Sequence, residues 1–126
     1  MLLPLDNRII SGSTIKEGGV ADCALLTMTD LSFVEFKTNV TSNSTKNIDS
    51  KTDDAIKQLW HTYDGIIKPR CHAKGINIPQ IVKLDFFIVF NKELDVTGAM
   101  ASRLNYQQEF MENYGYPLFF DNEKNF

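Results

Sequence analysis

The chain has 126 residues, which is enough for one domain with a hydrophobic core and too few for two. Hydrophobic residues make up 43% and charged residues 23%, as in an ordinary globular protein, so disorder over the whole length is not expected. The formal net charge of -3 argues against a strongly basic protein that coats nucleic acid, although it allows a local basic patch beside an acidic metal site.

The first third of the chain predicts two neighbouring strands. Residues 20–28 are mostly apolar and follow a pair of glycines, and residues 32–40 alternate in the direction of their side chains. A tight connection around Thr29 and Asp30 joins the two, so we expect an antiparallel hairpin. Residues 7–15, before the hairpin, are expected to be irregular or strand-like.

A polar segment and a helix come next. Residues 38–50 are rich in Thr, Ser and Asn and predict a mobile polar loop. Residues 51–67 carry apolar side chains at the spacing of one helix face, so they predict a helix. We expect Asp49 or Ser50 to cap its N-terminus and Pro69 to end it.

The last part of the chain predicts a strand, a helix and a short strand. Residues 81–90 are almost continuously apolar, which is typical of a strand buried on both faces. Residues 101–114 predict a helix that ends at Gly115, and residues 116–120 a final strand. Residues 121–126 are expected to form a frayed tail.

The order of these elements indicates the α/β class. An antiparallel hairpin followed by helix, strand, helix and strand predicts a mixed sheet, because strands reached through a helix usually run parallel. No internal repeat or linker divides the sequence, so residues 1–126 are expected to form a single domain.

Three charged side chains are expected on one face of the hairpin. Alternation along the second strand puts Glu35 and Lys37 on the same side. With a turn centred on Thr29 and Asp30, Asp22 faces Lys37 and lies diagonally from Glu35, about 7–8 Å away at the backbone. A loop with an even number of residues keeps this relationship, whereas a three-residue loop would break it.

This arrangement of charges suits a metal-dependent hydrolase. Two carboxylates on one face are costly unless a positive group lies between them. Mg²⁺, or Mn²⁺ in its place, takes oxygen ligands and leaves positions for water and phosphate. Such an ion stabilises charge on a phosphoryl group, and a lysine beside it can orient or deprotonate the attacking water. Asp22, Glu35 and Lys37 are therefore candidates for metal-assisted phosphodiester hydrolysis.

An acid on one strand, Glu-x-Lys on the next, and then a helix and a hydrophobic strand resemble the PD-(D/E)xK nuclease superfamily, which has a restriction endonuclease-like core. The resemblance covers about residues 18–90. It implies that Asp22 and Glu35 bind the metal and that Lys37 is catalytic. Many members also carry a polar residue on the following helix, and Gln58 is the nearest match.

The sequence also departs from the family pattern, which keeps two alternatives open. Ala21 stands where a proline precedes the first acid, and the usual N-terminal helix with another acid is not apparent, since Glu17 cannot be assigned that role. The first alternative is a catalytically inactive nuclease-like domain that serves as a binding or assembly module. The second is an unrelated α/β interaction protein, in which Asp22 and Lys37 form a plain cross-strand ion pair.

The nuclease hypothesis also predicts the partners and the location of the protein. The substrate would be nucleic acid, DNA rather than RNA, and a homodimer would let the protein cut both strands. No apolar run is long enough for a membrane span. The start of the chain lacks the basic flank of a signal peptide, and two cysteines suit a reducing compartment, so the cytoplasm is expected.

Overall fold

The computed structural model describes residues 1–5, 19–37, 45–90 and 100–120. Five strands form one sheet: β1 (Leu2–Pro4), β2 (Cys23–Leu26), β3 (Asp30–Lys37), β4 (Lys83–Phe90) and β5 (Leu118–Phe120). The helices are α1 (Thr45–Trp60), the π-helix η2 (His61–Ile67), α2 (Lys68–His72), α3 (Ile78–Ile81) and α4 (Met100–Tyr114). Within these described residues, no helix is long and apolar enough to cross a membrane.

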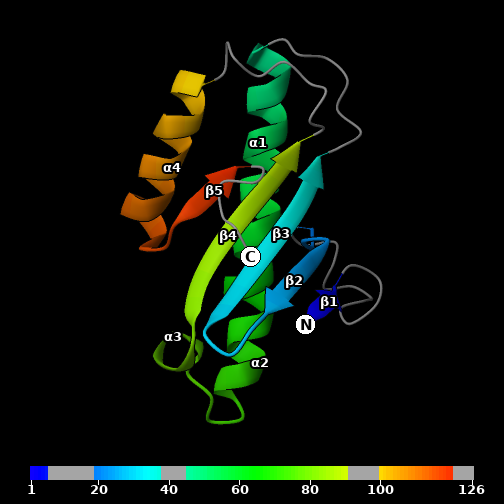
Figure 1. Cartoon of the computed structure of the whole chain (residues 1–126), viewed down its shortest axis with the longest axis vertical. Coiled ribbons are helices and arrows are strands. Elements are labelled where there is room, and N and C mark those ends of the chain that lie inside the picture. Colours follow the sequence, from blue (N-terminus) through cyan, green and yellow to red (C-terminus); the bar gives the residue numbers. More distant parts are fainter. Residues whose placement is uncertain (6–18, 38–44, 91–99, 121–126) are drawn as a thin grey trace.

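The strands lie in the sheet in the order in which they occur along the chain (Figure 1). β1 pairs with β2, and β2 with β3, in the antiparallel direction. β4 and β5 run parallel to β3, and the chain reaches each of them through helices. The predicted α/β class and mixed sheet, with a hairpin followed by parallel strands, are therefore confirmed.

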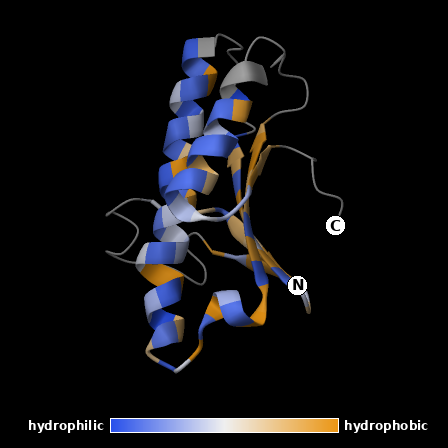
Figure 2. Cartoon of the chain, turned by 90° about the vertical axis from the view of Figure 1, so that its left-hand side faces the viewer, coloured by the Kyte–Doolittle hydropathy of each residue, from blue (hydrophilic) through white to orange (hydrophobic). Residues whose placement is uncertain are grey.

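The helices α1, α2 and α4 lie on one side of the sheet, so the protein has two layers (Figures 1 and 2). The main core fills the space between the layers, where Phe33 of β3 and Phe86 of β4 pack against Tyr63 and Phe110 from the helices. Side chains that alternate with these point to the other face of the sheet, where Val34 belongs to a smaller apolar cluster.

The hairpin turn lies one residue earlier than predicted. Thr27 N–H donates to the carbonyl of Asp30 at 2.9 Å, and the Thr27 hydroxyl accepts from Asp30 N–H at 3.0 Å. Met28 is therefore at the tip, where it is 98% exposed. Each strand partner moves by two positions, so that Ala24 faces Phe33. Because two is an even number, the same side chains remain on the same face.

The prediction for the first helix was wrong at both ends. α1 begins at Thr45, so residues 45–50 are helical rather than part of a loop, and neither Asp49 nor Ser50 is its cap. The rest of the predicted loop, residues 38–44, lies outside the described residues. The Thr and Asn side chains in this region suggest a loop by local propensity, but the tertiary contacts of buried Ile48 favour a helix.

Pro69 does not end the helix, because a π-helical turn precedes it. Lys68 N–H donates to the carbonyl of Tyr63, five residues back, at the end of η2. Pro69 then falls in the first turn of α2, where a missing N–H leaves no helical hydrogen bond unmade. The helical path consequently runs on to His72.

The other predicted elements are present with changed bounds, and residues 38–40 of the second predicted strand lie outside the described residues. The predicted strands at 20–28, 32–40, 81–90 and 116–120 correspond to β2, β3, β4 and β5, and the predicted helix at 101–114 corresponds to α4. Two short elements, β1 and α3, were not predicted. Residues 7–15 and the expected tail at 121–126 lie outside the described residues.

Candidate active site

The four candidate residues are joined by one run of contacts, in which Asp22 takes part through its backbone. Glu35 Oε1 accepts from the backbone N–H of Asp22 at 3.1 Å, and Glu35 Oε2 is 3.1 Å from Lys37 Nζ. Lys37 Nζ in turn donates to Gln58 Oε1 at 2.9 Å. The run links the residue before β2, two positions of β3 and the last turns of α1.

The corrected hairpin register decides which of these residues face one another. Cys23 pairs with Val34, so the next position outward places Asp22 opposite Glu35. The prediction that Asp22 faces Lys37 was therefore wrong, although the three side chains do share a face. Asp22 Oδ2 also accepts from Phe36 N–H at 2.7 Å, which fixes this carboxylate against β3.

Glu35 is buried on the helix-facing side of the sheet. It is 3% exposed, and its neighbours in the site, Asp22, Lys37 and Gln58, are each partly exposed. The position follows from alternation along β3, because Leu31 and Phe33 on the same side belong to the main core. The site therefore lies at the edge of the hydrophobic core, and Glu35 is its most buried residue.

Burial, followed by the negative charge of Asp22, raises the pKa of Glu35 to about 7. The hydrogen bond and charge of Lys37 act in the opposite direction and lower this pKa. Burial, together with the charges of Asp22 and Glu35, also raises the pKa of the Cys23 thiol. Burial and the charge of Asp22 thus disfavour the ionised form of Glu35, and Lys37 offsets this effect only in part.

A small polar cavity of about 280 Å³ adjoins Lys37 and Gln58. Gly19, Asp54 and Lys57 complete its lining. Gly19 has φ of 79°, and a Cβ at this position would lie 2.9 Å from Gln58 Cγ. The close approach of this backbone to α1 therefore requires glycine at position 19.

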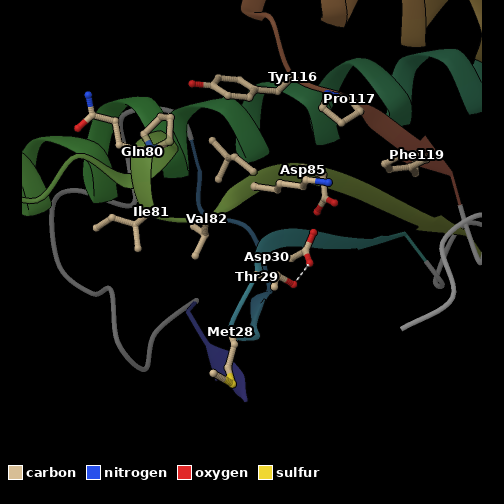
Figure 3. A pocket seen from close by; sticks show the side chains of 13 residues that line it. Met28, Thr29, Asp30, Gln80, Ile81, Val82, Asp85, Tyr116, Pro117 and Phe119 are labelled. Carbon is tan, nitrogen blue, oxygen red and sulfur yellow. Dashed lines mark hydrogen bonds between the residues drawn. The ribbon is translucent and has the colours of Figure 1, made fainter.

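A separate cavity of about 920 Å³ opens at the other end of β3 (Figure 3). Asp30 and Asp85 line it from neighbouring strands, and the Thr29 hydroxyl donates to Asp30 at 2.5 Å. None of the four candidate residues lines this cavity. It begins at the first residue of β3, whereas Lys37 is the last, so it is distinct from the candidate active site.

The described part of the chain supplies two carboxylates to the candidate site. Within it, no group of three or more His, Cys, Asp and Glu side chains is placed to hold a metal ion. Glu17, the other acid considered from the sequence, lies outside the described residues. The candidate ligand set is therefore Asp22 and Glu35.

Two residues of the site were missed in the sequence. Gly19 was treated only as a boundary of the first strand. Thr62 was not considered, yet its hydroxyl accepts from Ala21 N–H at 2.8 Å and donates to the carbonyl of Gln58 at 2.7 Å. Its position four residues after Gln58 places both on one helix face, and that spacing is the signal that could have identified it.

No protein-family model, curated protein or solved structure matches this chain.

Proposed function

We propose that this chain is a metal-dependent phosphodiesterase of nucleic acid, with a PD-(D/E)xK-type site in a restriction endonuclease-like core. The observation that carries the proposal is the single run of contacts joining Asp22, Glu35, Lys37 and Gln58. Asp22, Glu35 and Lys37 are candidates on residue type and spacing, and Gln58 is one by resemblance; Asp22, the β3 pair and Gln58 come from three separate segments of the chain. The mixed sheet with α1 packed against it supports the proposal, because the resemblance implies a scaffold of this kind.

The two carboxylates fit Mg²⁺ or Mn²⁺ in donor type and in charge. Hard divalent cations take oxygen ligands, and each carboxylate here has one oxygen that accepts from a backbone N–H. The other oxygen of Glu35 pairs with Lys37, but a carboxylate oxygen has a second lone pair that a metal can use. The raised pKa of Glu35 reflects burial and the nearby charge of Asp22, both of which a bound cation would offset. Asp22 and Glu35 would therefore hold the ion.

Bound there, the ion would stabilise charge on the phosphoryl oxygens and lower the pKa of a coordinated water. Lys37 would orient that water and stabilise the negative charge that develops in the transition state. Gln58 would hold the Lys37 ammonium in place, since its amide oxygen accepts from Nζ at 2.9 Å. Glu35 would hold it from the opposite side at 3.1 Å.

The polar cavity beside Lys37 supports a phosphate-bearing substrate. Lys37 and Lys57 line it together with one acid, Asp54, so the lysines outnumber the carboxylate and suit the charge of a phosphodiester. By resemblance we expect DNA rather than RNA, and cutting both strands would require two sites, which a homodimer provides. Cys23 and Cys71 are free thiols, which suits the reducing cytoplasm as the place of action.

A second candidate function is a catalytically inactive nuclease-like domain that acts as a binding or assembly module. The ion pair of Glu35 and Lys37 favours it, because these side chains are only 4% and 15% exposed. A shielded pair of this kind neutralises a carboxylate that the metal would need. Among the residues described, no third acid is placed with Asp22 and Glu35 to hold a metal ion, which favours the module as well.

Cleavage of a mixed pool of DNA and RNA with Mg²⁺ or Mn²⁺ separates the two functions. We expect metal-dependent cleavage by the unchanged protein and a loss of about 100-fold or more in Lys37→Met, because the ammonium beside the reacting water is removed. Lys68→Met is the matched control, since Lys68 pairs with Asp64 at 3.6 Å on the exposed surface. Equal inactivity of the unchanged protein and Lys37→Met with every metal would overturn the enzyme and leave the module.

A further inference from the structure

The hydroxyl of Thr62 joins the two segments that carry the candidate site. Thr62 is completely buried, and so is Ala21, whose backbone N–H donates to Thr62 Oγ1 at 2.8 Å. The same hydroxyl donates to the carbonyl of Gln58 at 2.7 Å. One side-chain oxygen thus connects the helical layer to a segment 41 positions earlier in the chain.

Each of the two peptide groups bonded to Thr62 belongs to, or adjoins, a residue of the candidate site. Ala21 immediately precedes Asp22, whose carboxylate is fixed by Phe36 N–H at 2.7 Å. Gln58 carries the amide that accepts from Lys37. A displacement of either peptide would therefore change the separation between the carboxylates and the lysine.

The chemistry of the contact requires a hydroxyl. A hydroxyl can donate one hydrogen bond and accept two, so it can satisfy the Gln58 carbonyl and the Ala21 N–H together. Valine has nearly the same shape but would leave the buried Ala21 N–H without a partner. Thr62 is the second residue of the π-helix η2, a kind of turn that is frequent at functional sites.

We propose that Thr62 is a positioning residue, which fixes the Asp22 carboxylate relative to Gln58 and Lys37 through its hydroxyl. The expected effect on metal binding rests on the proposed function, in which Asp22 is a metal ligand. The effect of Thr62 on the position of the Asp22 carboxylate does not depend on a metal. Loss of the hydroxyl should free the Ala21–Asp22 segment to move away from β3.

Thr62→Val and Thr52→Val form a matched pair of variants for this proposal. Thr52 lies in α1 and is also buried. Its hydroxyl donates to the carbonyl of Ile48, four residues back, at 2.7 Å, as that of Thr62 does to the carbonyl of Gln58. Both variants lose this bond within the helix, but only Thr62→Val loses the bond from Ala21. Thr62→Ser keeps a hydroxyl and should restore the properties of the unchanged protein.

Amide hydrogen exchange of Phe36 gives a readout that is independent of metal and of activity. This N–H donates to Asp22 Oδ2, so it exchanges faster when that carboxylate moves. We expect exchange at Phe36 to be at least tenfold faster in Thr62→Val than in Thr52→Val, and normal in Thr62→Ser. Thr62→Cys, whose thiol is a weak donor and acceptor, should be intermediate and serves if the valine variant does not fold.

The Mn²⁺ dissociation constant, measured on the same variants, separates this inference from the proposed function. We expect Thr62→Val to bind Mn²⁺ at least tenfold more weakly than Thr52→Val. Exchange at Phe36 that is no faster in Thr62→Val than in Thr52→Val would overturn the positioning role. Failure of the unchanged protein to bind Mn²⁺ would overturn the proposed function and the metal part of this inference, while the exchange rate would still decide whether Thr62 fixes Asp22.

Discussion

Glu35 affects the stability of the folded protein and is also one of the two proposed metal ligands. It is almost completely buried, faces Asp22, and is paired with Lys37 at 3.1 Å. Burial and the charge of Asp22 raise its pKa to about 7 from an ordinary value of 4.5, so the folded state favours the protonated form. At the edge of its core the protein therefore has a carboxyl group whose ionisation destabilises the folded state when no metal ion is bound.

The stability of the metal-free protein should consequently fall as the pH rises. The folded pKa of Glu35 lies above the unfolded value, so its stabilising contribution is complete below pH 4.5 and is lost as the pH rises through about 7. Relative to Glu35→Gln, which cannot ionise, the unchanged protein should lose about 2–3 kcal/mol of unfolding free energy between pH 5 and 8. Urea unfolding of both proteins in EDTA measures this difference, and a difference that does not vary with pH would show that Glu35 has an ordinary pKa.

The sequence was sufficient to predict which charged side chains share a face at the candidate site, but not which residues they contact. Alternation along β3 is enough to place Glu35 and Lys37 on one face, because the side-chain period of a strand is two. Which residue lies opposite Asp22 depends on the centre of the turn, which the hydrogen bonds of Thr27 place one residue earlier than expected. The spacing of Thr62 from Gln58 places both on one helix face, but the hydrogen bond from Ala21, 41 positions earlier, is visible only in the folded structure.

At the scale of elements, the approach of the Gly19 backbone to α1 shapes the cavity beside Lys37. A Cβ at Gly19 would lie 2.9 Å from Gln58 Cγ, and the backbone has φ of 79°. Gly75 has a nearly equal φ of 77° but no atom within 4 Å of such a Cβ. Substitution of Gly75 therefore measures the cost of backbone strain alone, whereas substitution of Gly19 also displaces Gln58.

Alanine at these positions should destabilise the protein in both cases and change the site in only one. Gly19→Ala and Gly75→Ala should each lose about 1–2 kcal/mol of unfolding free energy, because an L-residue is strained at positive φ. Only Gly19→Ala should also lower metal-dependent cleavage, by about tenfold, because Gln58 must move away from Lys37. Equal cleavage by the two variants would show that the position of Gln58 does not matter for activity.

The helices illustrate where local sequence signals fail. The apolar stripe predicts the middle of the first helix correctly, because helix periodicity persists over many residues. Its ends were wrong because capping residues and prolines act only through the hydrogen bonds around them. At Pro69 the π-helical turn changes those bonds, so the residue that usually ends a helix lies in the first turn of α2 and the helical path continues.

At the scale of the whole molecule, the two layers are held together by aromatic side chains from both. Phe86 of β4 is completely buried and lies within 5.1 Å of Phe110 and 5.6 Å of Phe33, measured between ring centroids. Trp60 stacks on Tyr114 at 4.0 Å, so α1 and α4 contact each other as well as the sheet. Continuous apolar residues in β4 predict this burial, and Phe87, which points to the other face of the sheet, is 1% exposed as well.

Truncation of Phe86 should therefore be far more costly than truncation of a phenylalanine at the surface. Phe86→Ala should lose about 3–5 kcal/mol of unfolding free energy, because it leaves a cavity between the layers. Phe36→Ala is the control, since Phe36 is 45% exposed, and it should lose less than about 2 kcal/mol. Chemical unfolding measures both, and similar losses would contradict the position of Phe86 at the centre of the core.

The α/β class and strand directions could be predicted because they depend on the order and length of elements, which long periodic segments reveal. β1 was missed because three residues are too few to show alternation, and its pairing with β2 involves positions far apart in the chain. Long-range pairing of this kind depends on the closure of the whole sheet rather than on local propensity.

The most direct test of the account is a titration with Mn²⁺, followed by electron paramagnetic resonance, of four proteins: the unchanged chain, Asp22→Asn, Glu35→Gln and Asp64→Asn. Asp64 is the control, because it is an exposed carboxylate that also pairs with a lysine. We expect one Mn²⁺ per chain that Mg²⁺ displaces, lost in Asp22→Asn and Glu35→Gln and retained in Asp64→Asn. Binding that is absent from the unchanged chain, or equally strong in all four proteins, would contradict it.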